Sequence, residues 1–371
     1  MEHFRWPWLA LVVALALLAG AVGGGLAGGI AGIYISGGRG ASTSQPIPTG
    51  PATNLVLNED SATVDVAKKV IPAVVTIVSV AQEDTRWGKV EQETAAGSGV
   101  IIDKKGYIVT NDHVVRDAEK LVVELSNGEK KEARVLGTDY PYLDVAVVKI
   151  DGNDLPVAEL GDSDRLVVGQ RVMAVGNPLA RFKHTVSQGI IGGLHRGWAS
   201  EGAVMEDLIQ SDAAINFGGS GGALVNMAGQ VVGINTTVVR TTKSGEIVEG
   251  MGFSLPINIV RTLAQEIIQH GKTARPYFGI AHQTLTPALA ASTDLPVPYG
   301  VYVVEVSADS PAGRAGLKKG DIISQIGRFP VDEDHPFLSI LMKFKPQDKV
   351  SVAFRRGNRT MQAELVLMER P

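Results

Sequence analysis

Short β-rich runs separated by turn residues are the pattern that most restricts the fold of residues 63–271. They occur at residues 99–102, 107–110, 121–125, 145–150 and 231–235. The Asn127-Gly128 dipeptide, which is typical of a tight hairpin turn, lies between two further runs of this kind. Many short strands at this spacing predict an all-β barrel or sandwich. A helix is predicted at 259–270, where apolar residues share one face and Gly271 can cap the end.

A second, smaller β unit is predicted at residues 276–368. Strands are expected at 300–306, 321–326, 349–355 and 360–366. The pair Ser310-Pro311 is typical of the start of a short helix, and Gly316 can end it. The chain is therefore predicted to be mainly β, with two successive folded domains.

The N-terminal 30-residue run 6–35 contains no charged side chain. Because about 20 apolar helical residues cross the hydrocarbon core of a bilayer, we predict a transmembrane anchor at residues 1–35. A cleaved signal peptide is the alternative, since Ala19-Gly20-Ala21 resembles a cleavage site. Residues 36–62, rich in Gly, Ser, Thr and Pro, predict a flexible linker.

Charge and composition exclude several classes of function. The formal net charge of −4 disfavours a protein that binds nucleic acid through its phosphates. The absence of cysteine excludes disulfides, thiolate nucleophiles and cysteine-held metal clusters. Since five of the seven histidines lack paired ligand spacing, no metal site and no bound cofactor are predicted.

The run Gly218-Gly219-Ser220-Gly221-Gly222 is the densest candidate for chemistry. A serine between glycine pairs predicts a sharply turned loop with an exposed hydroxyl group. Its backbone N–H groups can point at a developing negative oxygen. A plain flexible turn or a phosphate-binding loop is the alternative, although the Gly-Lys-Ser/Thr of a P-loop is missing.

A nucleophilic serine needs a base and a carboxylate that orients the base. His113 lies at the end of one predicted strand, and Asp144 lies directly before another. Singly, each has an ordinary structural interpretation, as a packed core histidine or as an acidic residue in a turn. Together with Ser220 they follow the order His, Asp, Ser, which is that of the chymotrypsin arrangement.

With these residues in view, the sequence resembles the HtrA/Deg serine proteases that carry one C-terminal PDZ domain. The matching stretches are residues 97–101, 110–115, 144–150, 176–178, 210–216 and 218–224. The resemblance implies two six-stranded chymotrypsin-like barrels, with His113 as general base, Asp144 as its orienting group and Ser220 as nucleophile. It also implies that the backbone N–H groups of Gly218 and Ser220 form the oxyanion hole, and that the protein is a homotrimer.

By the same resemblance, the primary specificity pocket involves Ile215, Asn235 and Thr236. No acidic residue marks a pocket for basic side chains, so small or medium apolar residues are expected there.

Three features depart from the family pattern, one of which is that Phe217 and Ala223 stand where Pro is common. Gly219 replaces the usual Asn before the serine, and Asp112 replaces the usual Asn beside the histidine.

In the second domain, Tyr277-Phe278-Gly279-Ile280 matches the carboxylate-binding loop of PDZ domains, and residues 310–321 fit the bacterial PDZ pattern. Successive N–H groups of such a loop can hold the C-terminus of a peptide that adds as a strand beside the sheet.

These expectations combine into one function. The protein is expected to be a single-pass, membrane-anchored, extracytoplasmic serine endopeptidase that cleaves misfolded polypeptides under control of its PDZ domain. One alternative is a chaperone or peptide-binding scaffold with an idle active site. Another is a regulatory protease for one membrane signalling protein.

Overall fold

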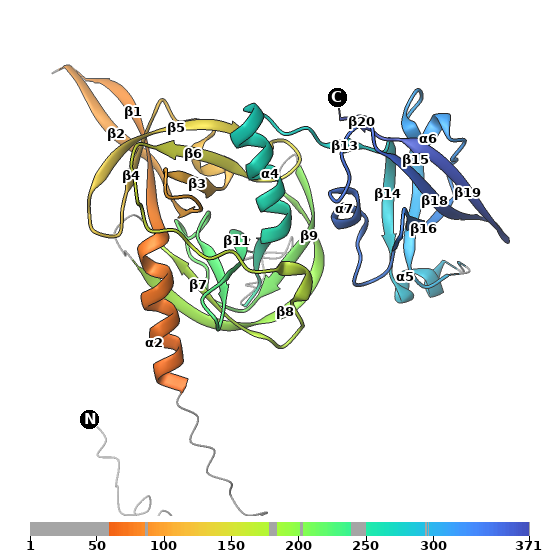
Figure 1. Ribbon diagram of the computed structural model, residues 1–371, viewed down its shortest axis with the longest axis horizontal. Coiled ribbons are helices and arrows are strands. Elements are labelled where there is room, and N and C mark those ends of the chain that lie inside the picture. The colour runs from red at the N-terminus through yellow and green to blue at the C-terminus, as the bar shows by residue number, and fades with distance from the viewer. Residues whose placement is uncertain are drawn as a thin grey trace, which may run out of the picture. The chain divides into compact units, whose positions relative to one another are not determined.

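The computed structural model describes residues 59–85, 88–177, 184–200, 203–238, 250–293, 295 and 297–370 (Figure 1). They belong to the compact unit Asn58–Pro371, whereas the other unit, Met1–Leu57, lies outside the described residues. The predicted anchor at 1–35 and almost all of the predicted linker at 36–62 therefore also lie outside them. In the part of the chain that is described, no helix is both long and apolar enough to cross a membrane.

The first β-barrel follows helix α2 (Glu59–Val70) and the 3-10 turn η1 (Ile71–Ala73). Helix α2 begins inside the stretch predicted as linker. The six barrel strands are β1 (Val74–Thr85), β2 (Gly88–Ile101), β3 (Tyr107–Thr110), β4 (Lys120–Glu124), β5 (Lys130–Thr138) and β6 (Ala146–Ile150). They close in the order β1-β2-β3-β6-β5-β4. As predicted, Asn127-Gly128 lies in the β4–β5 turn, where Gly128 has a φ of 88° that glycine adopts readily.

The second barrel has the same closure, in the order β10-β11-β12-β9-β8-β7. Its strands are β7 (Arg171–Gly176), β8 (Thr185–Ser200), β9 (Ala203–Ser211), β10 (Ala223–Asn226), β11 (Val231–Val238) and β12 (Gly252–Pro256). Helix α4 (Ile257–His270) follows and ends at Gly271. The Gly271 N–H donates to the Ile267 carbonyl, and Gly271 has a φ of 73°. This confirms the predicted helix and its glycine cap.

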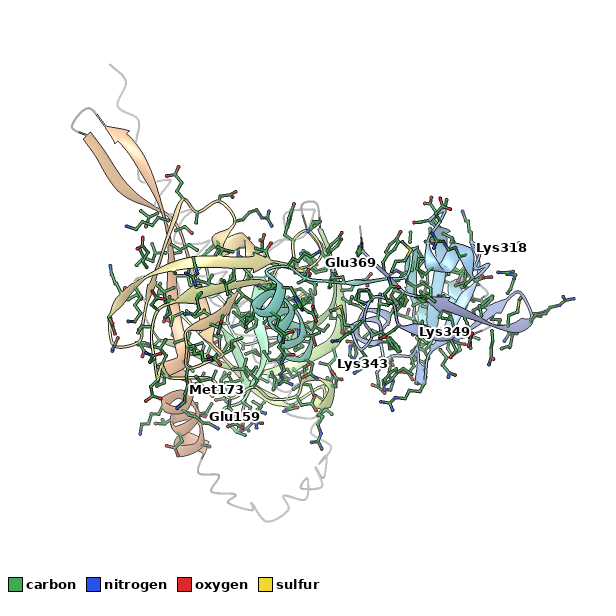
Figure 2. All side chains as sticks on the ribbon, turned by 45° about the horizontal axis from the view of Figure 1, so that its top comes forward. Glu159, Met173, Lys318, Lys343, Lys349 and Glu369 are labelled. Atoms are coloured by element: carbon green, nitrogen blue, oxygen red, sulfur yellow. The ribbon has the colours of Figure 1, made fainter. Side chains whose placement is uncertain are left out.

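One apolar core joins the two barrels. Val109 and Val147 of the first barrel and Met173 and Ala223 of the second belong to the same buried cluster, together with one face of α4. Outside this core, Lys69 of α2 bonds to Glu159 at 2.7 Å and to the Ala228 carbonyl at 2.9 Å, which ties the helix to connecting segments. Glu159 is labelled in Figure 2. The shared core thus fixes one barrel against the other.

The C-terminal part is a PDZ-type sheet with its own core. Its path is β14 (Ile280–Leu285), β15 (Gly300–Val306), β16 (Ile322–Ile326), β18 (Lys349–Arg356) and β19 (Arg359–Val366), and β17 (Phe329–Pro330) pairs with β16. Strands β13 (Pro276–Tyr277) and β20 (Met368–Glu369) pair separately, and the short helices are α5 (Pro287–Ser292), α6 (Pro311–Arg314) and α7 (Phe337–Leu341). The prediction of two six-stranded barrels followed by a PDZ-type sheet is confirmed.

Candidate active site

Strand pairing brings His113 and Asp144 together. His113 lies on the one-turn helix α3 (Asp112–Val115), directly after β3, and Asp144 lies directly before β6. Strands β3 and β6 are antiparallel neighbours in which Thr110 pairs with Ala146. Because the end of β3 and the start of β6 are opposite each other, the residues that follow and precede them must be close.

The Asp144 carboxylate accepts three hydrogen bonds. Its Oδ2 lies 2.7 Å from His113 Nδ1 and 2.7 Å from Thr236 Oγ1, and its Oδ1 accepts from the His113 backbone N–H at 3.0 Å. Burial of this carboxyl favours its neutral form, but the hydrogen bonds from His113 and Thr236 outweigh burial and lower its pKa. An ionised Asp144 keeps the proton on Nδ1 and leaves Nε2 of the ring able to accept one.

The Ser220 hydroxyl lies on the same network through Thr236. Its Oγ donates to the Thr236 carbonyl oxygen at 2.9 Å, while the Thr236 hydroxyl holds Asp144. Thr236 therefore contacts both ends of the predicted triad. Thr236 is predicted from the sequence only as a residue of the specificity pocket, and its bond to Asp144 is not predictable there because nothing local distinguishes it from other strand threonines.

Ser98 fixes the loop that carries Ser220. Its hydroxyl donates to the Gly218 carbonyl at 2.7 Å and accepts from the Asn177 N–H at 2.8 Å, and its own N–H donates to the Ser220 carbonyl at 2.8 Å. In the described part of the chain, no backbone carbonyl accepts from the N–H groups of Gly218 and Ser220. Sequence reasoning gave Ser98 no role, although it lies in the matched stretch 97–101.

Two glycines of the loop have conformations that other residues rarely adopt. Gly218 has a φ of 84° and Gly221 a φ of 82°. A Cβ atom on Gly221 would lie 2.0 Å from the Ser98 carbonyl oxygen. At Gly219 a Cβ atom would lie 2.8 Å from the Asn216 carbonyl oxygen, so this loop conformation fits glycine where the family usually has Asn. The loop is held closely by its neighbours.

A small cavity lies beside the loop. Its volume is about 20 Å³, and it is lined by Ala174, Val175, Gly176, Thr185, Ala214, Ile215, Asn216, Gly219 and Asn235. Two of the three predicted pocket residues, Ile215 and Asn235, are among them, whereas Thr236 is not. None of the lining side chains is charged.

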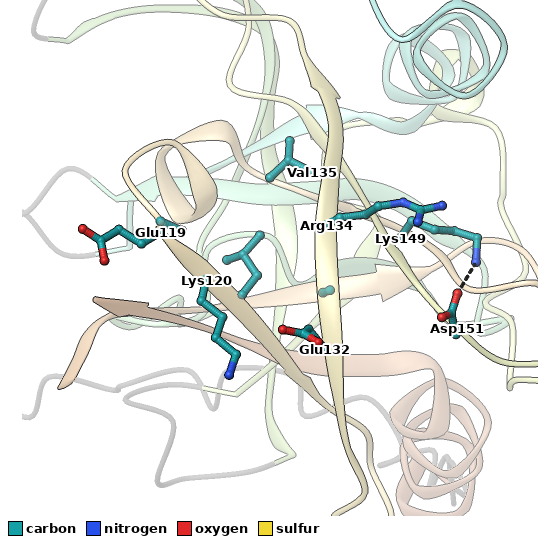
Figure 3. Close-up of a pocket in the computed structure, with 10 residues that line it drawn as sticks. Glu119, Lys120, Glu132, Arg134, Val135, Lys149 and Asp151 are labelled. Atoms are coloured by element: carbon teal, nitrogen blue, oxygen red, sulfur yellow. Dashed lines mark ion pairs between the residues drawn. The ribbon is translucent and has the colours of Figure 1, made fainter. Parts of the chain in front are cut away.

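A larger cavity lies elsewhere, on the first barrel (Figure 3). It has a volume of about 590 Å³ and is lined by residues of β4, β5 and β6 and their ends. Glu119, Lys120, Glu132, Arg134 and Asp151 give it charges of both signs. It contains none of the predicted site residues.

The predicted PDZ loop lines a further cavity of about 410 Å³. All four of its residues, Tyr277, Phe278, Gly279 and Ile280, contribute to the lining, together with residues of α7 and charged residues of both signs, which are Arg275, Arg370 and Glu206. Gly279 has a φ of 88°, and its carbonyl accepts from the Ser307 N–H at 3.0 Å. The loop is therefore fixed in a turn by the segment before α6.

Asp139 begins the loop that leads to Asp144, and it is buried opposite Arg275. Arg275 Nε lies 3.3 Å from Asp139 Oδ1, and the Asp139 N–H bonds to the Val145 carbonyl at 2.9 Å. Burial raises the pKa of Asp139 to about 6, although the Arg275 charge acts in the opposite direction. The folded chain thus holds a proton here at pH values where the unfolded chain has lost it.

This proton makes stability depend on pH with a definite sign. The contribution of Asp139 to stability should fall as pH rises from about 4 to about 6, by roughly 3 kcal/mol for a shift of about two pKa units, and should then level off. The stability of wild type relative to Asp139→Asn should therefore fall by this amount over the same range, which thermal unfolding of both proteins at several pH values would show. Asp154→Asn, at an exposed site, is the matched control. Parallel slopes in wild type and Asp139→Asn would contradict the assignment.

Comparison with known proteins agrees with this architecture. A trypsin-like peptidase domain matches residues 97–234, and a PDZ domain matches residues 276–367. The solved HtrA-type protease AlgW with a decapeptide is 33% identical, with a TM-score of 0.67, over 83% of this chain and 99% of that chain. The chain belongs to the HtrA-type serine protease family.

Two curated relatives are longer than this chain. A probable periplasmic serine endoprotease DegP-like of Pseudomonas fulva is 39% identical over 73% of this chain and 56% of that protein. The serine protease Do-like HtrB of Bacillus subtilis is 40% identical over 71% of this chain and 60% of that protein. The chain spans a little over half the length of these relatives.

Proposed function

We propose that this chain is a serine endopeptidase in which Ser220 is the nucleophile, His113 the general base and Asp144 the group that orients the base. The observation that carries the proposal is the set of three hydrogen bonds to the Asp144 carboxylate, two of them from His113. A carboxylate held this way fixes the imidazole tautomer that can accept the proton of a serine hydroxyl.

The reaction is acyl transfer from a peptide to Ser220. The Ser220 hydroxyl rotates from the Thr236 carbonyl toward His113, attacks the peptide carbonyl carbon and passes its proton to Nε2. The N–H groups of Gly218 and Ser220 stabilise the oxyanion, and each such donor contributes about 3 kcal/mol in serine proteases. His113 then protonates the leaving amine, and water hydrolyses the acyl-enzyme.

The residue before the cleaved bond is proposed to be small and apolar. The support is the cavity of about 20 Å³ beside the loop, which has an uncharged lining that includes Ile215 and Asn235. This volume is close to that needed for one water molecule, about 10–15 Å³. Large or charged side chains would have to displace the loop to enter.

The PDZ domain is proposed to bind peptide C-termini at Tyr277, Phe278, Gly279 and Ile280. The support is that all four residues line one cavity, and that the related AlgW has been solved with a decapeptide and with a tripeptide. Binding there would regulate the cleavage of misfolded polypeptides. The protein is proposed to be a homotrimer that residues 1–35 anchor to the membrane, with its protease and PDZ domains outside the cytoplasm. The periplasmic relatives support that location.

One observation favours a second candidate, a chaperone or scaffold with an idle active site. The Ser220 hydroxyl donates to the Thr236 carbonyl at 2.9 Å, and this bond competes with donation to the imidazole. A regulatory protease with one membrane-bound substrate would share the active enzyme's geometry and differ only in substrate range.

A fluorophosphonate probe separates an active enzyme from an idle scaffold, because it labels only an activated hydroxyl. We expect labelling of Ser220 in the full-length protein, mapped by mass spectrometry, and no labelling after heat denaturation. The experiment is run with and without a peptide that ends in a free carboxylate. A folded protein that stays unlabelled under both conditions would identify the scaffold instead.

A further inference from the structure

The residue before the proposed general base is a buried carboxylate. Asp112 is 1% exposed, and its Oδ2 accepts from Arg116 Nε at 2.6 Å and lies 2.5 Å from Arg116 Nη2. Carboxylates are almost never fully buried unless they are paired. Arg116 is four residues further on, at the end of the same one-turn helix α3, and it supplies the partner charge.

The Arg116 guanidinium also reaches the loop that delivers Asp144. Its carbon lies 3.7 Å from the centre of the Tyr140 ring, a geometry in which the cation is attracted by the face of the ring. Tyr140 follows Asp139, whose backbone N–H is bonded to the Val145 carbonyl. A chain of contacts therefore runs from Asp112 through Arg116 to Tyr140, parallel to the His113–Asp144 hydrogen bonds.

Asp112 and Arg116 also affect the electrostatic field at the His113 imidazole. The charged and titratable groups nearby are Asp144 and Tyr140 from the loop before β6, and Asp112 and Arg116 from the helix that carries His113. Without Arg116, Asp112 would add a second negative charge next to the base. Without Asp112, Arg116 would add an uncompensated positive charge. In a partly buried site, either charge acts over several ångströms.

We propose that Asp112 and Arg116 are positioning residues for His113: as a neutral pair clamped on Tyr140, they fix the helix of the base against the loop of Asp144 and cancel each other's field at the imidazole. The inference rests on the proposed function. It accounts for the departure from the family pattern at position 112, because the acid comes with its own partner at position 116.

The test is whether removal of the positive charge and removal of the negative charge shift the pH profiles of activity in opposite directions. In full-length protein, kcat/KM for a chromogenic peptide and the rate of fluorophosphonate labelling are measured against pH for Arg116→Gln, Asp112→Asn and the double variant. Arg116→Gln should move the acid limb of both profiles to higher pH by about half to one unit. Asp112→Asn should move it to lower pH. The double variant should return the limb to the wild-type position.

A purely structural pair would change the unfolding temperature without opposite shifts in the profiles. Lys104→Gln, which breaks the exposed Lys104–Asp154 pair at 2.8 Å, is the matched control and should leave both profiles unchanged. Unshifted limbs, or shifts of the same sign in both single variants, would overturn the inference while the proposed function stands. A wild-type protein that neither cleaves nor reacts would instead reject the proposed function.

Discussion

Replacing Ser220 with alanine should lower the rate of casein cleavage by about 10⁶-fold, which brings it to the level of binding and oxyanion stabilisation alone. The reason is chemical: alanine has no oxygen to form the acyl-enzyme, and His113 and Asp144 have no other nucleophile to activate. The rate of cleavage is measured from the release of soluble peptides. Covalent labelling by the fluorophosphonate probe should disappear in the same variant.

The fold should survive this substitution. The Ser220 hydroxyl makes one neutral hydrogen bond, to the Thr236 carbonyl, and such a bond contributes about 1 kcal/mol. The unfolding temperature should therefore stay near that of wild type. Ser292→Ala, at an exposed hydroxyl of α5 that donates to the Leu289 carbonyl in its own turn, is the control and should keep full activity. Cleavage that persists in Ser220→Ala would reject the assigned nucleophile.

Replacing Asp144 with asparagine should lower kcat by about 10⁴-fold at neutral pH. The three groups around the side chain all donate hydrogen bonds: His113 Nδ1, the His113 backbone N–H and the Thr236 hydroxyl. An amide offers one oxygen and one NH₂ group. If this NH₂ group is not to face the fixed backbone N–H of His113, it must face His113 Nδ1. Nδ1 must then accept a hydrogen bond instead of donating one. The ring proton moves to Nε2, and the imidazole can no longer take the proton of Ser220.

The measurement is kcat for peptide hydrolysis, with circular dichroism as the check on folding. Asp151→Asn is the control, because that carboxylate is fully exposed and lies 3.8 Å from its ion-pair partner Lys149. A loss of less than tenfold in a folded Asp144→Asn protein would show that this carboxylate does not set the tautomer of His113.

Local patterns were sufficient for many of the strands, for helix α4 and for the residue types that could carry chemistry, but not for helix α2, which begins inside the predicted linker. Short β-rich runs between turn residues predicted strands such as β3 and β6, and Asn127-Gly128 predicted the β4–β5 turn. Gly271 predicted the end of α4. The glycines around Ser220 predicted a sharply turned loop, which the positive φ angles of Gly218 and Gly221 now describe. These features depend on neighbours within a few residues, so the sequence shows them directly.

Tertiary structure alone decided the parts of the site that connect distant loops. Thr236 bonds to Asp144 across 92 residues of sequence, and Ser98 bonds to the Gly218 carbonyl across 120 residues. Both are buried side chains in strands or at strand ends, where periodicity predicts burial but not a partner. Their partners are set by how each barrel closes and by how the shared core fixes one barrel against the other. The amino-acid order thus determined which residues could do chemistry, and closure of the barrels determined which ones meet, because hydrogen bonds depend on positions within a few tenths of an ångström.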